Sequence, residues 1–538
     1  MGKRGAVVAL VFACVAAGAC SSTSSSKGID TTTVPGGATE SSTSSAGVPS
    51  GGESGAPEPT SPPASADLGD LVVGLDSEPP TLDPAANSLS LANGSVYAAI
   101  YETLFVATPT DPFEPLLATE ITPNADFTTW TLRLREGVTF QDGTPFDAEA
   151  VIFNLNRQKA SLYNGSSLGP MKQAVKVDDL TVEIQLNQSW VALPSLLTGI
   201  VGVMVSPAAA SAGGFDRNPV GTGPYRFVEW QAGQELVVQR HDTYWGESKA
   251  PLNSITFRFI PLEATRVAAF GAGEIDAFTT IIDDTAEQAK ADGAQVIAPP
   301  PTGFGFTLLN TSKAPLDDPR VRLALEIGYD RDAIASAYQG QGYADASYSP
   351  LLRTSEFWLP VEGTPTYDPE RAKQLLKEYG KPVKFTFRLL KGSQLIEDAV
   401  RATIEFWNDL GMDVTLELSN DLSSYVVATV TGGYDAVGWL GGSLGDPDSV
   451  FYNTFHSTGA GNYMRYSNQA VDAALDEARS NPDPAARKAA YEVVQAELRK
   501  DQPVLISSHG QIYIVASAKV AGLDPVFFFP SRSVRLAD

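Results

Sequence analysis

Apolar and polar residues alternate along several short stretches of the chain. Between Thr129 and Arg135 the bulky side chains of Trp130, Leu132 and Leu134 occupy every second position, which predicts a strand with one buried face. Comparable apolar runs, bounded by turn residues, predict further strands. These cover residues 71–75, 181–186, 225–230, 235–240, 254–260, 304–310, 384–389, 413–418, 504–507 and 512–515.

Other stretches repeat their apolar residues at helical spacing and carry helix start and stop signals. Asp147 is placed to cap a helix, Asp368 with Pro369 predicts a second capped start, and Gly380 predicts that helix's end. Because strands alternate with helices, the pattern predicts α/β layers with largely parallel sheets. The predicted helices cover residues 91–104, 264–270, 369–379, 395–410, 469–479 and 485–499.

The first residues have the features of an export signal. Lys3 and Arg4 precede an apolar stretch over residues 6–19, which is shorter than the ~20 residues of a membrane-spanning helix. Residues 1–19 are therefore predicted to be a signal peptide. Residues 17–20 (AGAC) resemble a lipobox, so Cys20 is the predicted lipidation site and the first residue of the mature chain; an ordinary secretory signal with a chance cysteine is the alternative. Residues 20–66, rich in Ser, Thr, Gly and Pro, are predicted to be this lipidated cysteine and a disordered tether.

Composition excludes several classes of protein. The chain has 538 residues, of which 43% are hydrophobic, enough for about three domains with full cores. Its net charge of −25 argues against nucleic-acid binding, because a phosphate surface would repel it. Cys14 and Cys20 both lie near the N-terminus, and His241, His456 and His509 are far apart. The folded part is therefore predicted to have no cysteine-held metal, no dedicated histidine metal site and no cofactor.

Short motifs follow one another in a fixed order between residues 70 and 510. They are residues 78–84 (EPPTLDP), 131–140 (TLRLREGVTF), 142–145 (DGTP), 219–225 (PVGTGPY), the set Asn310, Pro315, Arg320, Arg322 and Asp330, and residues 445–448 (GDPD). Together they resemble the extracytoplasmic solute-binding proteins of family 5, which serve peptide and nickel ABC importers. From the residues themselves, Gly221 and Gly223 are expected to shape a tight backbone path, and Arg320 and Arg322 to pair with carboxylates on a solvated helix face.

The resemblance implies an α/β fold of the periplasmic-binding-protein type II, with two lobes and an extra domain inserted in the first lobe. Mapping by the motifs places lobe I at 67–104, 223–304 and 508–538. It places the inserted subdomain at 105–222 and lobe II at 305–507.

The resemblance also implies a ligand site at the loop after the predicted strand that contains Trp439. In peptide-binding relatives an acid on this loop receives the peptide's α-ammonium, because a buried cation needs a fixed partner. Here that position falls on Ser443 or Gly442, neither of which is acidic. The predicted ligand-binding residues are Trp439, Gly442, Ser443 and Asp446, and either Asp446 or Asp448 is the candidate substitute acid. The non-acidic loop leaves open an N-blocked or modified peptide, or another polar metabolite.

The expected function is that of a lipid-anchored substrate-binding component of an ABC importer. It would capture a peptide or peptide-like solute between two lobes and deliver it to the permease. The chain is expected to be monomeric, exported, and held on the extracytoplasmic face of the cell membrane by its lipid. It is not expected to be an enzyme.

Three other readings stay open at this stage. The pattern Gly441-x-Ser443-x-Gly445 matches a serine-hydrolase nucleophile elbow, with His456 or His509 downstream. A chelated metal of the nickel type, with His456 as one ligand, is the second reading. An envelope chaperone or signalling receptor that has lost its transporter is the third.

Overall fold

We describe a computed structural model of the chain. It describes residues 68–538 except 88–89, 109–110, 248–249, 300–302, 338–344, 347–348, 352–354, 359–364, 392–393, 443–445, 524–532 and 537–538. The signal peptide, Cys20, the tether and Ser443 are predictions that lie outside these residues. Within the described part, no helix combines the length and the apolar composition needed to cross a membrane.

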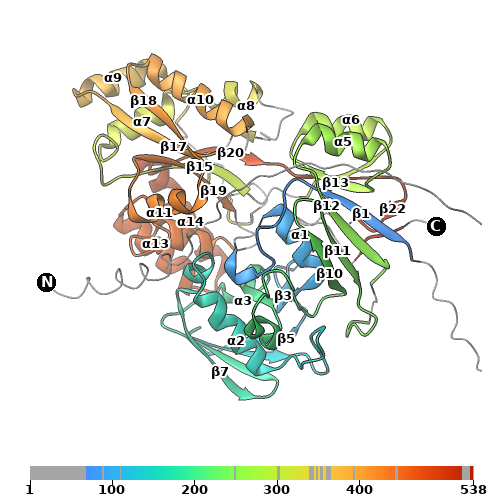
Figure 1. The fold of residues 1–538 in the computed structure, drawn as a ribbon. Coiled ribbons are helices and arrows are strands. Elements are labelled where there is room, and N and C mark those ends of the chain that lie inside the picture. Colours follow the sequence, from blue (N-terminus) through green and yellow to red (C-terminus); the bar gives the residue numbers. More distant parts are fainter. Residues whose placement is uncertain are drawn as a thin grey trace, which may run out of the picture. The chain divides into compact units, whose positions relative to one another are not determined.

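A seven-stranded sheet is formed by segments from both ends of the described chain. Its parallel centre consists of β1 between β12 and β13, and the outer pairs are antiparallel. Helices α5 (Glu263–Gly271) and α6 (Asp283–Ala291) pack against β13 (Figure 1). The strand order is β10 (Tyr225–Gln231), β11 (Glu235–Arg240), β12 (Ser254–Phe259), β1 (Asp70–Leu75), β13 (Ala277–Thr280), β21 (Tyr513–Ala516) and β14 (Gln295–Ile297).

A four-stranded antiparallel sheet with its own hydrophobic core follows in the chain. As predicted, Trp130, Leu132 and Leu134 of β6 are buried in that core. Asp147 caps α2 (Ala148–Lys159) by accepting the Ala150 N–H at 3.0 Å, also as predicted. The strand order is β5 (Ala118–Pro123), β6 (Thr129–Leu134), β8 (Thr181–Leu186) and β7 (Met171–Asp178).

Shorter elements lie before, within and after the four-stranded sheet in the chain. They are η2 (Pro84–Ala86), α1 (Leu91–Ile100), β2 (Glu102–Thr103), β3 (Phe105–Val106), β4 (Glu114–Pro115), η3 (Gly165–Leu168), α3 (Leu193–Leu196), η4 (Ile200–Gly202), β9 (Val203–Met204) and α4 (Pro207–Ala212). The helix predicted over 91–104 ends at Ile100. A side-chain Cβ at Gly221 or Gly223 would collide with backbone atoms of Ile100, which confirms that both glycines permit a close backbone approach.

The second large sheet has six strands and a helical cover. β17 is parallel to both of its neighbours, while the pairs around β15 and β20 are antiparallel. The predicted strand–helix–strand unit is β17, α10 and β18. The strand order is β16 (Asp345–Ala346), β20 (Val504–Gly510), β15 (Gly303–Leu309), β19 (Ala436–Gly442), β17 (Lys384–Leu390) and β18 (Asp413–Ser419).

Four helices of this region, α9, α10, α13 and α14, begin and end within two residues of the predicted bounds, whereas α8, α11 and α12 were not predicted. Asp368 caps α9 by accepting the Arg371 N–H at 2.9 Å, and Gly380 ends it in the left-handed conformation with φ 73°. The helices are α7 (Pro319–Ile327), α8 (Arg331–Ala337), α9 (Pro369–Tyr379), α10 (Gln394–Asp409), α11 (Leu422–Thr431), α12 (Asp448–Phe455), α13 (Gln469–Ser480) and α14 (Pro484–Asp501). A last strand pair joins β22 (Val520–Ala521) to β23 (Arg535–Leu536).

Two expectations from the sequence are wrong. The sheets are mixed rather than largely parallel, because hairpins such as β10–β11 and long returns such as β20 pair strands in opposite directions. Arg322 does not lie on a solvated face. It is 7% exposed and donates to the carbonyl oxygens of Leu316, Asp317 and Asp501, whereas Arg320 pairs with Asp318 as expected.

The division into lobe I, inserted subdomain and lobe II remains a prediction. Two of its predicted boundaries, after residues 304 and 507, fall inside β15 and β20, which belong to the six-stranded sheet. The chain passes between the two large sheets at 298–302, between β14 and β15, and again at 511–512, between β20 and β21.

Candidate functional site

The strand that carries the predicted ligand residues ends in a row of glycines. Gly442 is the last residue of β19, and its partner on β15 is Gly303. Gly303 also pairs with Gly510, the last residue of β20. Because glycine has no Cβ, three adjacent strand ends leave their backbones open to close approach by another chain or a small molecule. Gly303 and Gly510 were not predicted from the sequence, since their alignment with Gly442 depends on strand register.

Trp439 lies three residues before this edge and is half-buried. Its ring stacks on Tyr425, with centroids 6.2 Å apart and an interplanar angle of 6°, and meets the edge of Tyr463 at 5.8 Å. The indole is thus held by two aromatic neighbours at the border of a hydrophobic core. Its contact with a ligand stays a prediction.

Asp446 is the first described residue after residues 443–445, and it forms polar contacts with two other parts of the chain. Its carboxylate pairs with Arg487 of α14 at 2.6 and 2.7 Å, and its N–H donates to Ser195 Oγ at 3.1 Å. Burial disfavours the charge on Arg487, but the hydrogen bond and attraction from Asp446 raise the pKa of the guanidinium above its ordinary value. The predicted ligand role of Asp446 is untested. Its contacts fix Asp446 itself between α14 and α3.

Asp448, the other candidate substitute acid, is also paired, and it is 1% exposed. Arg479 of α13 donates to its carboxylate through Nε at 3.0 and 3.2 Å and through Nη2 at 2.9 Å. The buried indole Nε1 of Trp190 donates to Asp448 Oδ2 at 2.6 Å. Burial raises the pKa of the Asp448 carboxyl despite these partners. This contact was not predicted from the sequence, because Trp190 precedes α3 in a distant part of the chain.

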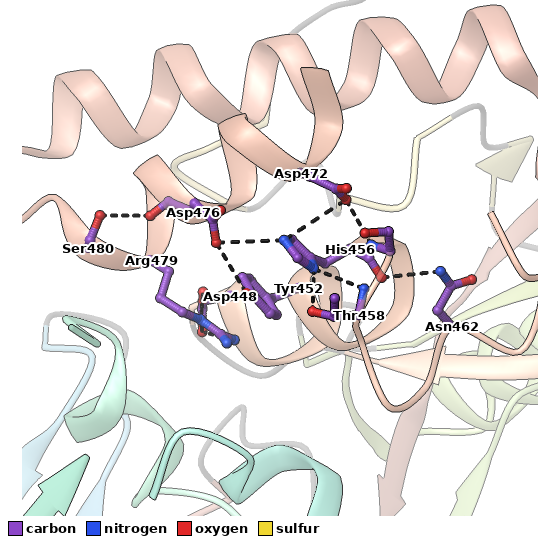
Figure 2. Close-up of polar contacts among 10 residues, drawn as sticks. Asp448, Tyr452, His456, Thr458, Asn462, Asp472, Asp476, Arg479 and Ser480 are labelled. Carbon is purple, nitrogen blue, oxygen red and sulfur yellow. Dashed lines mark hydrogen bonds and ion pairs between the residues drawn. The ribbon is translucent and has the colours of Figure 1, made fainter. Parts of the chain in front are cut away.

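An aromatic stack continues from Arg479 to His456, as Figure 2 shows. The guanidinium carbon lies 3.3 Å from the centroid of the Tyr452 ring, and that ring stacks on His456 with centroids 4.2 Å apart. His456 Nε2 faces Asp476 at 3.6 Å and Asp472 at 3.9 Å. Among the described residues, no group of three or more His, Cys, Asp or Glu side chains is arranged to hold a metal ion.

The second nitrogen of His456 is engaged as well. Nδ1 accepts the Thr458 N–H at 3.1 Å (Figure 2). The hydrolase reading requires a histidine that faces Ser443, which lies outside the described residues, and the contacts of His456 are made with other groups. The described part of the chain therefore gives this reading no support.

A cavity of about 130 Å³ adjoins Asp446. One wall comes from the segment 192–201 around α3 and η4, and the other from Asp446 and the first turn of α12, with Ser449 and Val450. Further hydrogen bonds fix the two walls: Val191 N–H donates to the Arg479 carbonyl at 2.9 Å, and Asn453 Nδ2 to Ser166 Oγ at 3.0 Å. Residues 166–167 and 190–201 thus belong to the surroundings of the candidate site, which the sequence did not indicate.

Comparison with solved structures defines the class of fold. The peptide complex of the periplasmic binding protein DppA from Helicobacter pylori superposes with a TM-score of 0.76, at 24% identity, over 87% of this chain and 98% of its own. NikA from Staphylococcus aureus, in complex with Ni(L-His)2, gives a TM-score of 0.74 at 20% identity, over 87% and 100% of the two chains. The chain has the periplasmic-binding-protein type II fold, as the sequence predicted.

The sequence itself then places the chain in a family. The profile of the bacterial extracellular solute-binding proteins, family 5 (middle part), matches residues 112–462. The chain belongs to this family, whose members bind solutes rather than act as enzymes. The glutathione-binding protein GsiB of Pectobacterium atrosepticum is 28% identical over 484 residues, which cover 86% of this chain and 93% of that protein.

Proposed function

We propose that the chain is the lipid-anchored substrate-binding component of an ABC importer, which captures a peptide or peptide-like solute and delivers it to the permease. The observation that carries the proposal is the row of Gly442, Gly303 and Gly510 at one edge of a family 5 fold. Strand ends that carry no side chains suit a ligand that itself has a peptide backbone, because they let its backbone approach closely.

Capture would use closure of two lobes over the solute. The chain connects the two large sheets twice, once between β14 and β15 and once between β20 and β21, and a hinge would use these two connections. A solute that contacts both lobes favours the closed state, because only that state contacts it from both sides. The closed shape would then dock on the permease.

The names of similar proteins support the solute class. One relative is a glutathione-binding protein, and one solved neighbour holds a peptide. Asp446 and Asp448 are each paired with an arginine, which supports solutes whose amino group is blocked, modified or bound elsewhere. Glutathione, N-blocked peptides and opine-like amino-acid conjugates share this peptide-like chemistry.

Ligand screening of the purified mature chain tests the proposal. Native mass spectrometry identifies any solute that copurifies, and thermal unfolding is then measured with glutathione, dipeptides, N-acetyl dipeptides and opines. The cognate solute at one hundred times its Kd should stabilise the folded state by about 2.7 kcal/mol and raise Tm accordingly. If the whole panel leaves Tm unchanged and no peptide-like solute copurifies, the proposed solute class is wrong.

The anchor is tested separately. Cys20 should incorporate labelled palmitate in cells, and Cys20→Ser should release the protein from the membrane fraction without changing solute binding. A wild-type chain that is unlabelled and released would contradict the lipid anchor and leave the ordinary secretory signal.

A further inference from the structure

The cavity beside Asp446 lies where two distant parts of the chain meet. Ser195, on α3, accepts the backbone N–H of Asp446, and Trp190 donates to Asp448 two residues later. These bonds hold the segment 192–201 against the start of α12. The hollow between them is therefore bounded by two separate parts of the chain rather than by a single loop, and it is partly open to solvent.

The walls of the cavity are mainly aliphatic. Leu196, Ile200 and Val201 line it from one side, and Val450 lines it from α12. The Ser195 hydroxyl, a polar group on the wall, already accepts a hydrogen bond from within the protein. Ser167, Ser449 and Asp446 are the other polar residues of the lining, and Asp446 is already paired with Arg487. The aliphatic part of the lining favours an apolar occupant, because apolar surface is best covered by apolar groups.

The size of the cavity limits what fits. About 130 Å³ is slightly less than the roughly 150 Å³ of an engineered apolar cavity that accepts benzene. A valine, isoleucine or leucine side chain has fewer carbon atoms than benzene and fits such a volume, whereas an indole ring has nine ring atoms against the six of benzene. A hollow left empty in an otherwise packed interface forfeits contacts for the atoms that line it, so an occupant stabilises the interface.

We propose that this cavity receives a compact aliphatic side chain of the bound solute. The inference rests on the proposed function and adds a specificity to it. Asp446 links the two places, because it lines the cavity and lies four residues after Gly442 at the glycine edge. Four residues span at most about 14 Å, so a small peptide is long enough to lie along the edge and place a side chain in the cavity.

Gly199 provides a way to fill the cavity without disturbing its walls. It lines the cavity, its φ is −96°, and an added Cβ would meet only the Leu196 carbonyl oxygen at an ordinary 3.7 Å. Gly199→Leu should therefore occupy the space with a side chain of the protein. Gly271→Leu is the matched control, since Gly271 ends α5 away from the cavity and an added Cβ there meets nothing within 4 Å.

The experiment is isothermal titration with two dipeptide series, X-Gly and Gly-X, each with a free and an N-acetylated amino end. X is Gly, Ala, Val, Leu or Trp. In one series the wild type and Gly271→Leu should bind the Leu peptide at least tenfold more tightly than the Gly peptide, and the Trp peptide no better than the Gly peptide. Gly199→Leu should bind the Gly and Leu peptides of that series within twofold of one another. Gly199→Ala fills less of the cavity and should show an intermediate preference for the Leu peptide over the Gly peptide.

The outcomes separate this inference from the proposed function. If wild-type affinity is flat along both series, or if Gly199→Leu keeps the preference for leucine, the cavity is not a side-chain subsite, although peptide binding stands. If no peptide, blocked peptide, glutathione or opine binds the wild type, the proposed function is wrong and the inference falls with it. An unchanged far-ultraviolet circular dichroism spectrum shows that each variant is folded.

Discussion

The indole Nε1 of Trp190 donates a hydrogen bond of 2.6 Å to Oδ2 of Asp448, a residue 258 positions later in the chain. Trp190 is fully buried, and Asp448 is buried with it. Arg479 completes the arrangement by pairing with the same carboxylate. This bond joins the region of the four-stranded sheet to the start of α12, so it stabilises the contact between two distant parts of the chain.

Replacing Trp190 by phenylalanine tests the strength of that bond. Trp190→Phe keeps an aromatic ring but removes the N–H, leaving a buried carboxylate with one donor fewer. The free energy of unfolding, measured by urea denaturation, should fall by about 1.5–3 kcal/mol. Trp230→Phe is the control, because Trp230 donates to the half-exposed Glu78 at 2.8 Å and should lose only about 1 kcal/mol. Equal losses in the two variants would contradict a special role for the Trp190 bond.

The buried position of Arg322 gives a second prediction. Arg322→Met should lower the free energy of unfolding by roughly 3 kcal/mol, because it removes the donors to three backbone carbonyls, two of them beside α7 and one at the end of α14. Arg320→Met, on the exposed side of the same helix, should leave urea denaturation nearly unchanged. A similar loss in both variants would mean that Arg322 acts only as a surface charge.

The pair of Asp318 and Arg320 should make the free energy of unfolding depend on pH in acid. The hydrogen bond from Arg320 lowers the pKa of the Asp318 carboxyl below its ordinary 3.8. A carboxyl whose pKa is lower in the folded state contributes stability that is complete above its unfolded pKa and is lost as pH falls through the folded pKa. Asp318→Asn keeps a helix-capping side chain but cannot ionise. The difference in free energy of unfolding between wild type and this variant should thus be constant from pH 5 to 7 and shrink below pH 4. A difference that grows in acid would mean that folding raises the pKa of Asp318 instead of lowering it.

The contacts of His456 argue against the nickel-type alternative. Its Nδ1 accepts the Thr458 N–H, and its Nε2 faces Asp472 and Asp476. A Ni(II)–histidine complex should therefore produce no rise in Tm that depends on this residue. His456→Gln is compared with wild type in the same titration. A rise in Tm that nickel–histidine causes in wild type and that His456→Gln abolishes would replace the peptide proposal with metal binding.

Replacing Ser443 tests whether an acid at this position would bind the amino group of a ligand. If the alignment with peptide-binding relatives holds, Ser443→Asp supplies a fixed carboxylate for a ligand's ammonium group and should strengthen binding of unblocked dipeptides at least tenfold. N-acetyl dipeptides, which have no ammonium group, should gain nothing. Unchanged or weaker binding of the unblocked peptides would remove this explanation of the non-acidic loop.

Much of the local structure is determined by the sequence alone. The alternation around Trp130 and the caps at Asp147 and Asp368 act within a few residues, and all three are present in the fold. The order of the motifs also indicated the family. Such motifs contain the residues that the backbone of the fold requires, such as Gly221 where two segments approach closely. Side-chain periodicity and capping depend on neighbours along the chain, so both can be predicted without knowing how the rest of the molecule folds.

Tertiary structure decided what the site consists of. Strand direction, the register that aligns Gly442 with Gly303, the burial of Arg322 and the contact of Trp190 with Asp448 all join residues that are far apart in the chain. Each depends on which surfaces pack together, and a buried charge is stable only where packing supplies its partner. The amino-acid order specifies which partners are available, while the arrangement of the sheets determines which of them meet.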